Sequence, residues 1–141
     1  MRFLSVRQPW ADAIARGWKV IENRKQAPPR SVLSQQVAIH AALSWGLTGS
    51  PGDILPNGRT VRRNTCARGG VVAVATVVGY GWTEEQLLRL ASYDELRWWQ
   101  RTQVGIVLRD VKRIRQPVPV RGMLGWPELP PDVEAAILAQ I

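Results

Sequence analysis

Short hydrophobic runs, separated by segments rich in glycine and proline, recur along the chain. Five of them show the consecutive or alternating apolar residues typical of strands: residues 3–6, 18–23, 36–41, 70–79 and 103–114. The run 70–79 is almost entirely Val and Ala, so it is apolar on both faces and predicts a central strand or a barrel wall. In residues 18–23, strict alternation places Trp18, Val20 and Glu22 on one face and Lys19 and Ile21 on the other.

Helices are predicted at a few of the connections between these strands. Pro9 stands at the start of the first helix, where its missing N–H costs nothing, and Gly17 is a natural stop. Thr83 is expected to cap a second helix, with Gln86 three residues later completing a capping box. Residues 130–132 introduce a third.

Many short strands with few helices predict the α+β class. A small mixed β-barrel flanked by two to three helices fits better than a doubly wound sheet, because no strand–helix connection carries a Gly-rich phosphate loop. The length of 141 residues suits one core and predicts a single domain, 1–141. Residues 43–69 hold seven glycines and prolines and predict a long irregular loop.

Composition excludes several kinds of site. Cys66 is the only cysteine and His40 the only histidine, which excludes a disulfide framework, a Cys-based zinc site and a His-rich metal site. We therefore expect no metal and no cofactor. No apolar stretch approaches the ~20 residues of a membrane span, and residues 1–7 lack the apolar core of a signal peptide. These features predict a cytoplasmic protein without a membrane partner.

The charge is strongly positive and unevenly spread. Lys and Arg number 19 against 11 Asp and Glu, a net charge of +8, and the chain has seven Trp. Residues 1–30, 56–69 and 97–121 carry +5, +4 and +6, and the rest carries −7. If these segments converge, they form a surface suited to phosphates, with Trp98 and Trp99 available for stacking. The candidate nucleic-acid patch comprises Arg59, Arg62, Arg63, Arg97, Arg101, Lys112 and Arg113. The alternative is solvated loops around core tryptophans.

Four segments together resemble the ASCH domain, which is named for its homology to a transcription coactivator of the activating-signal-cointegrator type. They are LSVRQPWA at 4–11, GWKVIENR at 17–24, VAIHAA at 37–42 and VPVRGMLGW at 118–126. The resemblance extends over nearly the whole chain. It implies a β-barrel of the PUA-like superfamily with a cleft beside the barrel, and an association with RNA binding and modified-base recognition.

One ASCH branch removes acyl groups from N4-acylated cytidine with a Lys, a Thr three residues later and a Glu on a later strand. Lys19 matches the Lys, Glu22 stands at the Thr position, and the strand 71–78 contains no acid. Ribonuclease activity is also reported for some family members. The resemblance thus implies either a nucleic-acid-binding module or a hydrolase acting on RNA or a nucleoside.

The candidate catalytic residues are Lys19, Glu22 and His40. Lys19 suits a phosphate contact, or a base if burial lowers its pKa. Since Lys19 and Glu22 are three residues apart, a bulge or a strand end is needed to bring their side chains together. The alternatives are a surface Lys19–Glu22 pair and a His40 that only makes structural hydrogen bonds.

Four further residues are candidate ligand contacts. Ser5 and Gln8 are placed to read a base edge, Trp10 to stack on a base, and Arg24 to hold a phosphate or carboxylate. Trp10 packed on the barrel and Arg24 paired with Glu22 are the alternatives. The expected partners are RNA, single-stranded DNA or a modified nucleoside.

A protein-interaction domain, anchored by exposed Trp98 and Trp99, is a third possibility.

Overall fold

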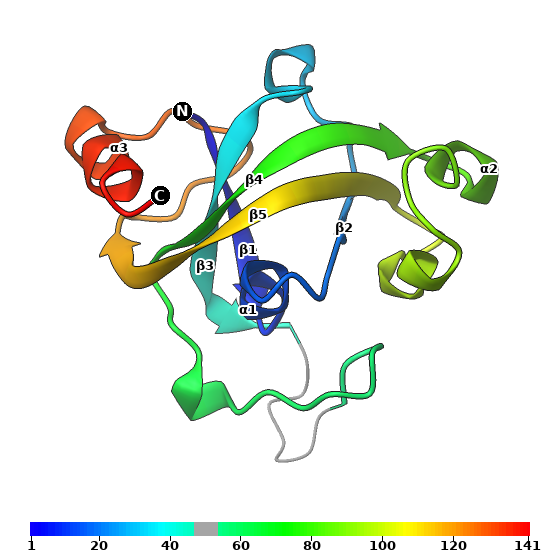
Figure 1. Cartoon of the computed structure of the whole chain (residues 1–141), viewed down its shortest axis with the longest axis horizontal. Helices are drawn as coiled ribbons and strands as arrows, with labels where there is room; N and C mark the ends of the chain where they lie inside the picture. Colours follow the sequence, from blue (N-terminus) through cyan, green and yellow to red (C-terminus); the bar gives the residue numbers. More distant parts are fainter. Residues whose placement is uncertain (47–53) are drawn as a thin grey trace.

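The computed structural model describes residues 1–46 and 54–141, which form a mixed sheet with helices around it (Figure 1). Within these ranges the strands are β1 (Phe3–Gln8), β2 (Ile21–Arg24), β3 (Gln36–Trp45), β4 (Gly70–Gly81) and β5 (Val104–Pro119). The helices are α1 (Trp10–Ala15), α2 (Glu84–Leu87) and α3 (Pro131–Leu138), with 3₁₀ turns η1 (Arg30–Val32), η2 (Arg63–Thr65) and η3 (Asp94–Trp98). The predicted α+β class is confirmed. None of the helices described has the length and hydropathy to span a bilayer.

The strand order is β1-β3-β4-β5-β2, with β1 and β3 parallel and the other pairs antiparallel. β1 and β2 are therefore the two edges, and no backbone pairing in the described ranges joins them. Within these ranges the sheet is not closed into the small mixed β-barrel that the sequence predicts. A side chain crosses between the edges instead, since the Arg24 guanidinium on β2 donates to the Ser5 carbonyl on β1.

The apolar run 70–79 lies at the centre of the sheet, as predicted. On one face, Ala75 of β4 belongs to the same buried cluster as Ile14 of α1. On the other, Val74 packs in a cluster with Ile137 of α3. Because both faces of β4 are covered, alternation with polar residues is absent from most of its length.

Three predicted boundaries differ from the structure. β3 continues to Trp45, which pairs with Gln8 of β1, so three residues of the predicted 43–69 loop belong to a strand. Residues 47–53 of that loop lie outside the described ranges. The strand predicted over 103–114 continues to Pro119 as β5, because Val118 pairs with Val71 across the sheet. α2 is capped by Thr83 as predicted but ends after one turn.

The start of β2 also differs. The backbone N–H groups of Trp18 and Lys19 both donate to the Ala13 carbonyl at the end of α1. We call this segment between α1 and β2 the hooked connection. Because of it the regular strand begins only at Ile21, and the side chain of Lys19 does not follow the alternation expected of residues 18–23.

Candidate functional site

A cleft of about 1250 Å³ opens where the edge strands β1 and β2 approach each other. Its lining combines the two edge strands with the start of α1, the segment after η3 and the chain around Trp126. Of the predicted site residues, the lining includes Ser5, Trp10, Lys19, Glu22, Arg24 and Arg97.

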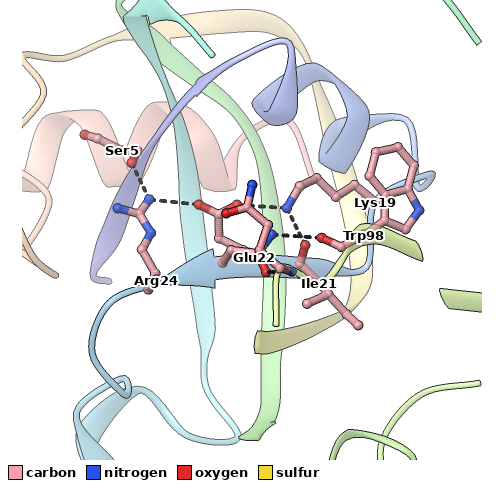
Figure 2. Close-up of polar contacts among 8 residues, drawn as sticks. Ser5, Lys19, Ile21, Glu22, Arg24 and Trp98 are labelled. Atoms are coloured by element: carbon pink, nitrogen blue, oxygen red, sulfur yellow. Dashed lines mark hydrogen bonds and ion pairs between the residues drawn. The ribbon is translucent and has the colours of Figure 1, made fainter. Parts of the chain in front are cut away.

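Lys19 and Glu22 form a buried ion pair in this cleft. The Lys19 Nζ lies 2.9 Å from Glu22 Oε1 and also donates to the Ile21 carbonyl (Figure 2). Lys19 is 3% exposed and Glu22 6%. Two residues three apart in a regular strand would point to opposite faces. Lys19 and Glu22 can make contact because Lys19 precedes the regular strand, which begins at Ile21. Burial lowers the pKa of Lys19 below its usual value, and the Glu22 carboxylate opposes that effect.

Arg24 occupies the other side of the Glu22 carboxylate. Its Nη2 lies 3.1 Å from Glu22 Oε2 and also donates to the Ser5 carbonyl (Figure 2). Each carboxylate oxygen of Glu22 thus faces one cation, and two positive charges converge on one buried negative charge. The group as a whole is cationic toward the cleft.

Three tryptophans contribute to one wall. The Trp10 and Trp98 rings meet edge to face, with centroids 6.4 Å apart. Trp98 is only 5% exposed, whereas Trp10 and Trp99 are half-buried. Trp98 is therefore not an exposed anchor for a protein partner, contrary to the third interpretation of the sequence.

Asn23 fixes the position of this wall and was not singled out from the sequence. Its Nδ2 donates to the Trp98 carbonyl at 2.8 Å, and its Oδ1 accepts from the Gln100 N–H at 2.7 Å. The only sequence signal for it is its place inside the GWKVIENR segment. These two bonds hold the Trp98–Gln100 segment against β2.

The cleft lining is rich in positive charge. Its basic residues are Arg7, Lys19, Arg24, Lys25 and Arg97, and its single acid is Glu22. Such a lining favours an anion over a cation as ligand. Within the described ranges, no three His, Cys, Asp or Glu side chains are grouped as a metal site requires.

His40 and Gln8 do not line the cleft. His40 is 2% exposed, with Nδ1 3.0 Å from Ser5 Oγ and Nε2 2.9 Å from the Val120 carbonyl. The carbonyl can only accept, so Nε2 carries the proton and Nδ1 accepts from the hydroxyl. Gln8 donates to the Ala67 carbonyl and accepts from the Asp12 N–H. Their polar atoms are used within the framework, so we leave both out of the proposed site.

Protonation of His40 is expected to destabilise the fold. Burial lowers its pKa below 6.5, although the bond to Val120 opposes this. Below pH 6.5 the unfolded chain binds a proton that the folded chain does not, so the free energy of unfolding falls as pH drops through the folded pKa. Urea unfolding between about pH 5 and pH 8 measures the effect, and His40→Gln should flatten this part of the profile. Equal slopes in both proteins would contradict it.

The seven residues of the candidate nucleic-acid patch are all exposed, but their surroundings differ. Arg97 lines the cleft, and Arg101 lies 5.2 Å above the Trp99 ring and 3.1 Å from Glu84. Two others lie near α1: Arg59 stands over the Trp18 ring, and Arg113 lies 3.8 Å from Asp12. The remaining three are Arg62, Arg63 and Lys112.

Comparison with known proteins agrees with this fold. The sequence model of the ASCH domain matches residues 4–115. A search of curated proteins finds no match. The crystal structure of an ASCH protein from Zymomonas mobilis has a TM-score of 0.58 and 16% identity, covering 98% of this chain and 93% of that one. Crystal structures of two point mutants of that protein are also 16% identical to this chain, with TM-scores of 0.57 and 0.56. Both alignments cover 98% of this chain, and they cover 94% and 96% of the mutant chains, respectively.

Proposed function

The chain belongs to the ASCH domain family, and on that premise we propose that it is a nucleic-acid-binding module whose cleft holds one nucleotide of a single strand, preferably RNA. The observation that carries the proposal is the pairing of part-exposed tryptophans with basic side chains in one cleft of about 1250 Å³. Unpaired bases stack on aromatic rings, and backbone phosphates attract arginine and lysine. Both halves of a nucleotide therefore have a complementary surface.

The base would contact the aromatic wall. Trp10 and Trp99 line the cleft and are half-buried, so part of each ring is available to a ligand. Trp98 packs edge to face on Trp10, and Asn23 fixes the backbone on both sides of Trp99. A wall held in this way loses little conformational entropy when a base stacks on it.

The phosphate would contact the basic residues of the cleft. Three basic side chains line the cleft and are exposed, so they can contact a ligand without breaking buried contacts. They are Arg7, Lys25 and Arg97. Glu22 does not cancel their charge, because Lys19 and Arg24 already surround it. A phosphate held here displaces counterions, which makes the affinity salt-dependent.

Salt titration tests this proposal. A labelled trinucleotide and an oligouridine of about twelve nucleotides should both bind at low ionic strength, with log affinity falling linearly against log salt concentration. A slope near −0.7 is expected for each neutralised phosphate of a single strand. A duplex of the same length should bind more weakly, since its bases are not free to stack. Absence of binding at low salt would refute the proposal.

The second candidate is hydrolysis, and the buried Lys19–Glu22 pair favours it. A lysine whose pKa is lowered by burial is closer to proton transfer at neutral pH than an exposed lysine. The chemistry implied by the ASCH resemblance is attack on N4-acylated cytidine or cleavage of RNA. Hydrolysis would be supported if the parent protein releases cytidine from N4-acetylcytidine, or shortens an RNA oligomer, and Lys19→Ala does not. If the parent protein turns over neither substrate, binding alone remains.

A further inference from the structure

A second concentration of positive charge lies beside α1, outside the cleft. Arg16 and Arg59 each place a guanidinium carbon 5.0 Å from the ring centre of Trp18. Arg16 also pairs with Asp12 at 2.7 Å, and Arg113 of β5 approaches the other oxygen of Asp12 at 3.8 Å. We refer to Arg16, Arg59 and Arg113, together with Trp18, as the α1 arginine surface.

The α1 arginine surface has more positive charge than its own contacts neutralise. Asp12 is the single acid among these contacts, and it is 8% exposed with both oxygens facing arginines. Arg16, Arg59 and Arg113 are all exposed. Three accessible cations against one buried carboxylate leave a positive surface that suits a polyanion.

This surface adjoins the cleft through two short pieces of chain. Trp18 directly precedes Lys19, which lines the cleft. In the turn closed by the Ile54–Thr60 bridge, Pro56 lines the cleft while Arg59, three residues later, lies over Trp18. Three residues span at most about 11 Å. A ligand leaving the cleft past Pro56 therefore meets Arg59 next, which shares Trp18 with Arg16.

We propose that the α1 arginine surface binds the sugar–phosphate backbone of the same strand whose nucleotide occupies the cleft. The inference rests on the proposed function and extends it from one nucleotide to a longer single strand. The flat, delocalised arginine cations fit phosphate oxygens, and stacking against Trp18 limits the motion of two of them. A protein with both contacts binds a long strand more tightly than a short one.

Arg59→Ala combined with Arg113→Ala tests the inference. Neither side chain is buried. Relative to the parent, the double variant should bind the oligouridine of about twelve nucleotides with a salt slope smaller by ~1.4, the sum expected for two phosphate contacts. Its trinucleotide affinity should be unchanged. Arg59→Lys combined with Arg113→Lys should restore most of the slope, since the charge is kept.

Arg89→Ala is the matched control. It also removes one exposed arginine, but Arg89 follows α2, and α2 lies at the edge of the molecule, away from α1 (Figure 1). Because no phosphate contact is proposed at Arg89, the slope should stay that of the parent. An unchanged slope in the double variant, with trinucleotide binding intact, overturns the inference and leaves the proposed function standing. If the parent protein does not bind the trinucleotide and the double variant loses binding of the oligouridine, the result supports the α1 arginine surface as a binding site. It refutes the cleft as the nucleotide site.

Discussion

Replacing Glu22 with Ala should lower the free energy of unfolding by about 3–5 kcal/mol, the usual cost of removing one partner of a buried ion pair. The loss is large because Lys19, 3% exposed, would either hold a buried charge with no carboxylate beside it or have to release its proton. Arg24 would lose its only acidic contact in the described structure. Urea unfolding followed by tryptophan fluorescence measures the change.

Two further variants separate charge from packing. Lys19→Met combined with Glu22→Leu removes both charges of the buried pair and should cost less than Glu22→Ala alone. Glu128→Ala removes a carboxylate that is 66% exposed and pairs with Arg2, and should cost no more than about 1 kcal/mol. If Glu22→Ala costs no more than Glu128→Ala, the buried pair does not stabilise the fold as described.

Replacing Trp99 with Ala should weaken trinucleotide binding by roughly 5- to 150-fold, which corresponds to the 1–3 kcal/mol typical of one base stacked on an aromatic ring. Trp99 is half-buried, lines the cleft and donates through Nε1 to the Gln103 carbonyl at 2.9 Å. Trp99→Phe keeps an aromatic face and should recover much of the affinity. Fluorescence anisotropy with a labelled trinucleotide measures all three proteins.

Trp82→Ala provides the control for this experiment. Trp82 is 48% exposed and does not line the cleft, so its loss should leave the affinity unchanged. Equal affinities in the parent and Trp99→Ala would contradict a stacking role for the wall. Equal losses in Trp99→Ala and Trp82→Ala would indicate binding by general tryptophan contact instead of by the cleft.

Local patterns were sufficient to predict the central part of the fold. The Val- and Ala-rich run 70–79 has no polar face, so only a covered, central position suits it, and β4 occupies that position. The Thr83 cap and the start of α1 after Pro9 also depend on neighbouring residues alone. Closure of the sheet depends on how distant edges meet, which no local pattern encodes. Here the edges are joined by the Arg24 side chain.

Contacts between site residues were predictable only where those residues are close in sequence. Lys19, Glu22 and Arg24 fall within six residues, and the structure brings them together. Their contact depends on the hooked connection after α1, which alternation could not anticipate. Asn23 acts on Trp98, 75 residues away, and such a pairing leaves no trace in either segment alone. His40 is a residue type that often transfers protons in catalysis, but both of its ring nitrogens are hydrogen-bonded here, one to Ser5 and the other to Val120. The sequence around His40 does not show these two partners.

A crystal structure of the protein with a bound trinucleotide tests the central claim most directly. The expected result is one base against Trp10 or Trp99 in the cleft, with its phosphate near Arg7, Lys25 or Arg97. A trinucleotide bound elsewhere on the protein, with the cleft free of nucleotide, would contradict the assignment of the cleft as the nucleotide site.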